Sequence, residues 1–229
     1  MRQFQEKTTL DDARESTEYT VDALEAWPDK VVQALARPLH AVLETLAAIE
    51  SRRRDARRAL TRANARVRIW DAFADDLLRE FNKDLLGAAR QNRSSDLYRA
   101  FIPDDLAALT DLSLEPESAA FTAMLAELKK KTTPEALRKR YVPEFERVVT
   151  HATAALQARG KAISDIASAD ADFARWKDQA NRRRRAVDGS LTTHAAEKGL
   201  PADFNERFQP AVGGSQRAKK KTVEPVKPG

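Results

Sequence analysis

The chain contains 229 residues, of which 42% are hydrophobic, 33% are charged and 7% are aromatic. It has seven glycines and no cysteine, which excludes collagen-like sequence, disulfide frameworks, thiolate metal sites and cysteine nucleophiles. The net charge is +5, but residues 51–70 carry +7 and residues 71–128 carry −7. Such blocks either pair inside a helical bundle or leave the basic block to face an anionic partner.

No stretch of the sequence approaches the roughly 18 consecutive apolar residues that a membrane helix needs. The first residues also lack the apolar core of a signal peptide. We therefore expect a cytoplasmic protein with no membrane partner.

Helix-forming residues dominate, and apolar residues recur at spacings of three and four, which predicts an all-α helical bundle. We expect a first helix over residues 8–27 and a short second helix over 29–37. A long third helix should run from Pro38 to about Gly87 unless it breaks near residues 62–64. Prolines favour helix starts, because the first turn leaves its amide protons unused. Four prolines are predicted to begin helices: Pro28, Pro38, Pro134 and Pro143.

Landmark residues repeat along the chain at a spacing of 105 to 107 residues: Pro28 and Pro134, Pro38 and Pro143, Trp70 and Trp176, Pro103 and Pro210. This spacing predicts a tandem duplication, in which residues 1–112 form a first helical repeat and residues 113–212 a second one packed on it. Residues 213–229 are predicted to be a disordered basic tail. The two tryptophans should then occupy comparable environments.

The two long helical stretches carry matching apolar seams, since residues alternating by three and four line one face of a helix. Six of the ten aligned positions are identical. The first seam is Val42, Leu46, Ile49, Arg53, Ala56, Leu60, Ala63, Val67, Trp70 and Ala74, and the second is Val148, Ala152, Ala155, Arg159, Ala162, Ile166, Ala169, Phe173, Trp176 and Ala180. Alanine-rich seams allow close approach, so the long helices should pack antiparallel in a pseudo-twofold bundle. Arg53 and Arg159 either pair with a carboxylate, such as Asp84 for Arg53, or extend their head groups to water.

Signatures of catalysis are lacking in the sequence. The three histidines are scattered, and there is no phosphate loop, dinucleotide-binding glycine pattern or serine elbow. Three pairs of aspartates fall at helix starts or on exposed faces, where acids stabilise the helix dipole: Asp11 and Asp12, Asp75 and Asp76, Asp104 and Asp105. We therefore expect no enzyme activity, no metal site and no cofactor.

Basic clusters are the best signal of a partner. Arg54, Arg58, Arg62 and Arg66 are four residues apart, so they form one stripe of about 18 Å along a helix. Other candidate contacts with an anionic partner lie in the arginine run and the tail: Arg182, Arg183, Arg184, Arg185, Lys219, Lys220 and Lys221. The stripe either pairs with acids of neighbouring helices, such as Asp75, Asp76 and Glu80, or contacts an external anion.

These features predict a non-enzymatic structural or protein-protein interaction module, a helical-bundle component of a larger cytosolic assembly of bacterial type. Its expected partners are other protein subunits or further copies of the chain. The alternative is a nucleic-acid-binding protein that uses the arginine stripe and the lysine-rich tail. No aromatic residues interleave with the arginines, as they would in a single-strand-binding surface.

Overall fold

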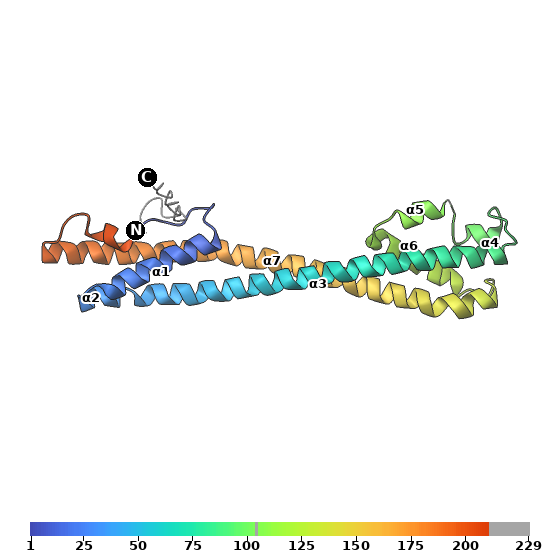
Figure 1. Ribbon diagram of the computed structural model, residues 1–229, viewed down its shortest axis with the longest axis horizontal. Coiled ribbons are helices and arrows are strands. Elements are labelled where there is room, and N and C mark those ends of the chain that lie inside the picture. Colours follow the sequence, from blue (N-terminus) through green and yellow to red (C-terminus); the bar gives the residue numbers. More distant parts are fainter. Residues whose placement is uncertain (104, 211–229) are drawn as a thin grey trace, which may run out of the picture. The chain divides into compact units, whose positions relative to one another are not determined.

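A computed structural model describes residues 1–103 and 105–210 of the chain, and within these ranges every regular element is a helix. The all-α prediction is therefore confirmed for the described residues. Seven α-helices and one 3-10 helix follow in chain order: α1 (Leu10–Ala26), α2 (Lys30–Ala34), α3 (Arg37–Ala88), α4 (Asp96–Arg99), α5 (Leu106–Thr110), α6 (Leu114–Leu128), α7 (Glu135–Lys198) and η1 (Phe204–Phe208) (Figure 1). Among these helices, none is both long enough and apolar enough to cross a membrane.

Local sequence signals set the starts of the first helices. A capping box begins α1, since the Thr9 hydroxyl accepts a hydrogen bond from the Asp12 amide and the Asp12 carboxylate accepts one from the Thr9 amide. Asp29 caps α2 through the Val31 amide, at 2.7 Å. The predicted first, second and third helices are all confirmed, and α3 continues through residues 62–64 without a break.

The prediction that Pro143 begins a helix is wrong, because α7 begins at Glu135 and contains Pro143 in its ninth position. Pro143 has no amide proton to donate to the carbonyl of Lys139 one turn earlier. The helix continues because Tyr141 and Phe145, on either side of the proline, are both buried in one core cluster. Pro143 itself is exposed, so water can hydrate the carbonyl that lacks a donor.

Replacing Pro143 with Ala should increase the free energy of unfolding by about 1–2 kcal/mol, because a proline inside a helix removes a hydrogen bond and crowds the preceding turn. Urea unfolding followed by circular dichroism measures this change. Pro134→Ala is the matched control, since Pro134 lies just before α7 and its substitution should be neutral or slightly destabilising. Equal effects of the two substitutions would contradict the interior position of Pro143.

The described chain divides into two compact units. Unit 1 combines residues 1–51 with residues 169–210, and unit 2 consists of residues 52–168. Each long helix contributes one part to each unit, and the predicted repeat boundary at residues 112 and 113 lies inside unit 2. The compact units are therefore not the two predicted repeats, and the duplication stays a prediction.

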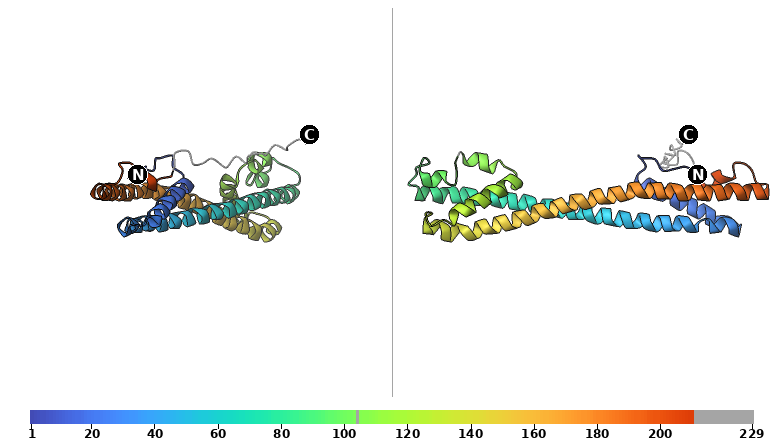
Figure 2. Two further views of the ribbon diagram at one scale, coloured as in Figure 1. Left: turned by 60° about the vertical axis from the view of Figure 1, so that its left-hand side comes forward. Right: turned by 180° about the vertical axis from the view of Figure 1, so that it is seen from behind.

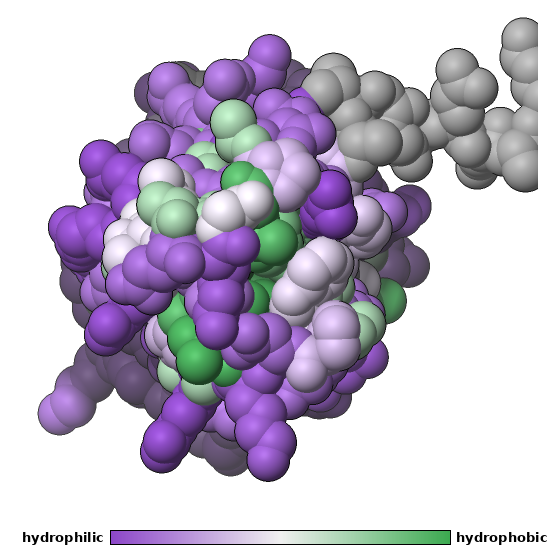
Figure 3. All heavy atoms as spheres, turned by 90° about the vertical axis from the view of Figure 1, so that its left-hand side faces the viewer, coloured by the Kyte–Doolittle hydropathy of each residue, from purple (hydrophilic) through white to green (hydrophobic). Residues whose placement is uncertain are grey.

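Unit 1 contains α1, α2, the first part of α3, the last part of α7 and η1 (Figures 1 and 2). Its first core cluster joins all five elements, with buried Val21, Leu24, Val32, Ala36, Leu39, Val187, Leu191, Ala195, Phe204 and Phe208. Its second cluster packs α1 and α3 against α7, with buried Ala13, Val42, Leu46, Ile49, Trp176 and Ala180. At the end of this unit shown in Figure 3, apolar residues lie among hydrophilic ones.

Gly199 ends α7 in this unit. Its φ of +62° is a left-handed conformation that glycine adopts without strain. This turn lets the Leu200 amide donate to the carbonyl of Ala195 at 2.8 Å, the long bond of a Schellman motif. The chain then reverses towards η1, whose Phe204 and Phe208 both contact Trp27 edge-on.

Unit 2 contains the last part of α3, then α4, α5 and α6, and the first part of α7. One core cluster holds it together, with buried Ala74, Leu77, Leu78, Phe81, Leu85, Ala89, Tyr98, Phe101, Ile102, Phe121, Met124, Leu128, Leu137, Tyr141, Phe145 and Val148. Phe81 lies at its centre, in edge-on contact with Phe101, Tyr141 and Phe145. The long helices run antiparallel within this unit, because Trp70 contacts His151 whereas Asp84 contacts Tyr141.

The predicted apolar seams correspond to the inward faces of α3 and α7. Most of their residues are buried, and buried alanines recur every seven residues at Ala56 and Ala63 and at Ala155, Ala162 and Ala169. Arg53 is half-buried and Arg159 is exposed. Asp84 is not the partner of Arg53 as suggested by the sequence, because it binds Arg140 and accepts a hydrogen bond from the Tyr141 hydroxyl at 2.8 Å.

The two tryptophans of the predicted repeat differ in environment. Trp176 is 2% exposed, and its indole Nε1 donates to the carbonyl of Val42 at 2.9 Å. Trp70 is half-buried and stacks on the exposed His151 ring. The expectation of comparable environments is therefore wrong in the extent of burial, because Trp176 is buried and Trp70 is only half-buried. Neither ring is freely exposed.

Candidate anion-binding surface

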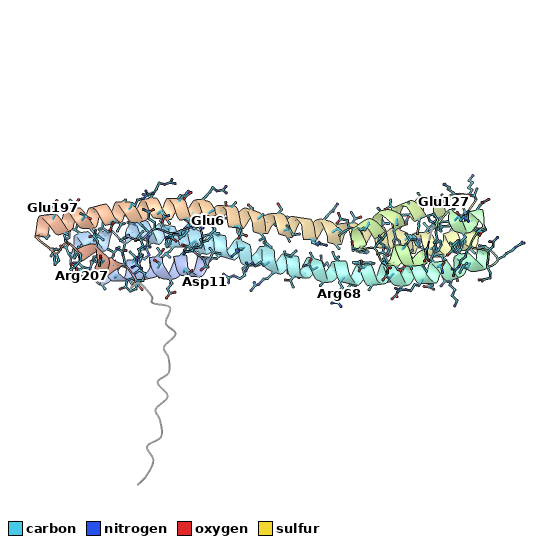
Figure 4. All side chains as sticks on the ribbon, turned by 90° about the horizontal axis from the view of Figure 1, so that it is seen from above. Glu6, Asp11, Arg68, Glu127, Glu197 and Arg207 are labelled. Carbon is cyan, nitrogen blue, oxygen red and sulfur yellow. The ribbon has the colours of Figure 1, made fainter. Side chains whose placement is uncertain are left out.

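The predicted arginine stripe lies on the solvent-facing side of α3 in unit 2. Arg54, Arg58, Arg62 and Arg66 are all exposed, whereas Ala56 and Ala63 on the opposite side are buried. The four-residue spacing repeats with a rise of about 6 Å, because each helical residue adds about 1.5 Å. We call these four residues the arginine face. Arg68, just beyond it, also points away from the ribbon (Figure 4).

The acids of residues 1–103 and 105–210 leave most of the arginine face unpaired. Arg58 lies 3.8 Å from Asp55, and both side chains are 68% exposed, so this pair contributes little. Within the described part of the chain, no carboxylate lies within ion-pair distance of Arg54, Arg62 or Arg66.

The acids suggested by the sequence as partners of the arginine face pair elsewhere. Asp75 and Asp76 bind Arg79 at 3.4 and 3.0 Å. Glu80 binds Arg140. The interpretation in which these acids neutralise the arginine face is therefore wrong.

The neighbouring stretch of α7 in unit 2 adds little negative charge. Residues 150–168 carry a net charge of +1, and their exposed side chains are mostly small and uncharged, as at Thr153, Ala154, Gly160 and Ser164. An anionic partner can therefore approach the arginine face without repulsion from a cluster of carboxylates on this stretch of α7.

An aromatic cluster lies one helical turn beyond Arg66. The rings of Trp70 and His151 stack with centroids 4.4 Å apart and an interplanar angle of 7°. The Arg147 guanidinium lies 5.6 Å from the Trp70 ring centroid and 5.2 Å from that of Phe73. This cluster could not be predicted from the sequence, because its members come from two helices and no local spacing joins Trp70 to His151.

The second arginine run, Arg182 to Arg185, lies on α7 in unit 1, and its side chains differ in exposure. Arg182, Arg183 and Arg185 are exposed, and the first two line a shallow hollow of about 520 Å³ with Gln179 and Ala186. Arg184 is 1% exposed, so it cannot contact an external anion and is removed from the candidate contacts. The helical period explains the difference, because Arg184 falls on the face that carries Ala180 and Val187. The remaining candidates, Lys219, Lys220 and Lys221, lie outside the described residues.

One acid of unit 2 has a strongly raised pKa and was not among the candidates from the sequence. Glu117 on α6 is fully buried in unit 2, and neither carboxylate oxygen has a hydrogen-bond partner. Burial, reinforced by the charges of Asp75 and Asp71, raises the pKa of Glu117 to about 8. No group of three metal-ligating side chains in the described ranges is arranged to hold a metal ion.

The three histidines each have a structural neighbour. His40 binds Glu25 at 2.6 Å, His151 stacks on Trp70, and the buried His194 lies 3.4 Å from Asp29. His40 and His194 thus pair with two different carboxylates, whereas His151 makes an aromatic contact.

Comparisons of the chain with protein-family models, with curated proteins and with solved structures found no match. The function of the arginine face is therefore inferred from its geometry alone.

Proposed function

We propose that this chain is a non-enzymatic interaction module, a component of a larger assembly, that binds a polyanion through the arginine face of α3. The observation that carries the proposal is the exposure of four regularly spaced guanidinium groups that the acids among the described residues leave largely unpaired. A guanidinium group forms two parallel hydrogen bonds to a phosphate or a carboxylate. Four of them on one helix face supply a continuous row of such contacts.

Nucleic acid is the partner class that this surface fits best. A phosphate backbone presents charges of one sign at regular intervals, as the arginine face does with the opposite sign. The exposed His151 ring, which stacks on Trp70 beside the end of the row, adds a flat surface of the kind that contacts bases. Other protein subunits were the first expectation from the sequence, and the unpaired arginine face favours the nucleic-acid alternative over it.

Fluorescence anisotropy of labelled duplex DNA and RNA over a salt series tests the proposal. Substituting Gln at Arg54, Arg58, Arg62 and Arg66 together should reduce the slope of log K against log salt concentration by about 3 to 4, since each phosphate contact contributes about 0.9. A chain ending at Pro210 reports separately on the contribution of the basic residues that follow.

The matched control removes the same charge from another surface of unit 2. Lys129, Lys130, Lys131 and Lys139 are exposed, and three of them are paired with glutamates. Substituting Gln at these four lysines should change the slope by less than about 1. Equal losses in the two variants would indicate a response to net charge alone, and no binding at low salt would overturn the nucleic-acid proposal.

We also infer that the chain arose by tandem duplication, and the composition of the two units supports this. Unit 1 joins the start of α3 to the end of α7, and unit 2 joins the end of α3 to the start of α7. Positions 106 residues apart are buried in both units, as at Val42 and Val148, Ala74 and Ala180, and Leu85 and Leu191. A short helix precedes each long one, α1 before α3 and α6 before α7.

A further inference from the structure

Residues 2–6 of unit 1 form a non-helical segment that lies on α7 (Figure 4, which labels Glu6). Its main chain is held by side chains of α7 and by Gln209, whose Oε1 accepts a hydrogen bond from the Arg2 amide at 3.0 Å. Asn181 accepts a hydrogen bond from the Phe4 amide at 2.7 Å and donates one to the Phe4 carbonyl at 2.9 Å. Arg184 Nε donates to the Arg2 carbonyl at 2.9 Å, and Lys177 Nζ donates to the Glu6 carbonyl at 2.8 Å.

One side chain of the segment anchors it. The Phe4 ring stacks on Trp176 with centroids 5.4 Å apart, and the Arg184 guanidinium lies 4.7 Å from its centroid. Phe4 is half-buried, whereas the other side chains of residues 2–6 are exposed. The site therefore binds backbone at several positions and selects a side chain at one, as sites for short linear peptides do.

The polar residues of this site are poorly explained by folding alone. Arg184 is 1% exposed, and no carboxylate in the described chain lies within ion-pair distance of it. Its Nη2 donates to the Ser16 hydroxyl of α1 at 3.3 Å, and its Nη1 atom has no hydrogen-bond partner. Burial lowers the pKa of Arg184 to about 10. In the proposed duplication the equivalent position of unit 2 is the buried Leu78, so on that proposal a hydrocarbon side chain suits this place in the bundle. When the segment leaves, water can reach Arg184 and Asn181, so the open state carries no unpaired buried charge.

We propose that Trp176, Lys177, Asn181 and Arg184 form a peptide-binding groove, and that residues 2–6 are an internal occupant displaced by a short non-helical segment of a partner protein with an aromatic side chain at the Phe4 position. This groove lies in unit 1 and is independent of the arginine face in unit 2. A second copy of the chain offers only the same segment, which the tethered copy outcompetes through its high effective concentration. A partner segment with better contacts at the four exposed positions, or at the anchor, displaces the internal segment.

The test uses the full chain and a labelled, acetylated peptide with the sequence Arg-Gln-Phe-Gln-Glu-Lys. Phe4→Ala weakens the internal occupant, so this variant should bind the peptide at least about tenfold more tightly than the wild type, because the open fraction of the groove rises. Gln3→Ala is the matched control, since Gln3 is exposed in the same segment, and it should bind as the wild type does. A peptide with Ala in place of Phe should not bind.

Two further variants locate the site. Adding Asn181→Leu to Phe4→Ala should abolish binding, because it removes both main-chain hydrogen bonds, whereas adding Arg185→Gln, at an exposed neighbour, should not. Circular dichroism checks that each variant keeps its helix content, and Phe4→Leu replaces Phe4→Ala if that variant loses it. Equal peptide binding by Phe4→Ala and Gln3→Ala would overturn the proposal. A wild-type dimer that Phe4→Ala converts to a monomer would also overturn it, by identifying the occupant as a second copy.

Discussion

Substituting Gln for Glu117 should raise the free energy of unfolding by about 3 kcal/mol at pH 7. The buried carboxyl stays protonated in the folded chain, whereas it ionises when the chain unfolds. Each pH unit above the pKa of the unfolded chain therefore favours unfolding of the wild type by about 1.4 kcal/mol. Glutamine resembles the protonated glutamic acid in size and polarity. It leaves the packing on α6 unchanged while removing the group that ionises when the chain unfolds.

The pH dependence of this effect has a definite sign. The folded pKa of Glu117 is about 8, above the value of 4.5 for an unperturbed glutamate. The wild type therefore has its full stability with respect to this group below pH 4.5, and loses it progressively as the pH rises towards 8. The difference between Glu117→Gln and the wild type should be near zero at pH 4 and largest at pH 8 and above.

Denaturant unfolding of both proteins at several pH values measures this difference. Glu115→Gln is the matched control, because Glu115 is exposed on the same helix two residues earlier. Its effect should stay within about 0.5 kcal/mol at every pH, as for most surface substitutions. A pH-independent difference between Glu117→Gln and the wild type would show that the carboxyl is hydrated in the folded chain.

The position of Glu117 was detectable in the sequence. Leu114, Phe121 and Leu128 follow one another at spacings of seven and mark the buried face of α6, and Glu117 falls between the first two on that face. An acid on the apolar face of a helix is unusual. In the charge block of residues 71–128, Glu117 is one of many acids, and the others that the structure describes are exposed or half-buried. Periodicity applied residue by residue would therefore have predicted a buried carboxyl here.

Other features depend on contacts that no local pattern encodes. The long helices and their seam follow from a repeating spacing, so the sequence predicts them well. In the sequence, the four arginines from Arg182 to Arg185 look equivalent. Only the packing of unit 1 shows that Arg184 is buried while its neighbours are exposed. Phe4 packs on Trp176, 172 positions away in the sequence, and the Phe4 main chain is held by hydrogen bonds with side chains. Such contacts to a non-helical segment leave no periodic pattern in the sequence.

Trp176→Ala should cost about 3–5 kcal/mol of unfolding free energy, the range for removing a large aromatic side chain from a core. The ring is 2% exposed, packs with Val42, Leu46 and Ile49, and stacks with Phe173 at 5.7 Å. Its Nε1 hydrogen bond to the Val42 carbonyl is lost as well. Neighbouring helices cannot close the space, because the α3 and α7 backbones are already held together by adjacent seam residues.

Trp70→Ala is the matched comparison, since Trp70 takes the corresponding seam position in the other long helix. Its ring is half-buried and is covered by His151 and Arg147, which lie at the surface and can collapse into the space that the ring leaves. We expect a loss of about 1–2 kcal/mol. Urea unfolding followed by circular dichroism compares the two variants, and equal losses would contradict the difference in burial between them. Unequal losses would reflect the two environments, which are a closed core around Trp176 and a solvent-facing stack beside the arginine face around Trp70.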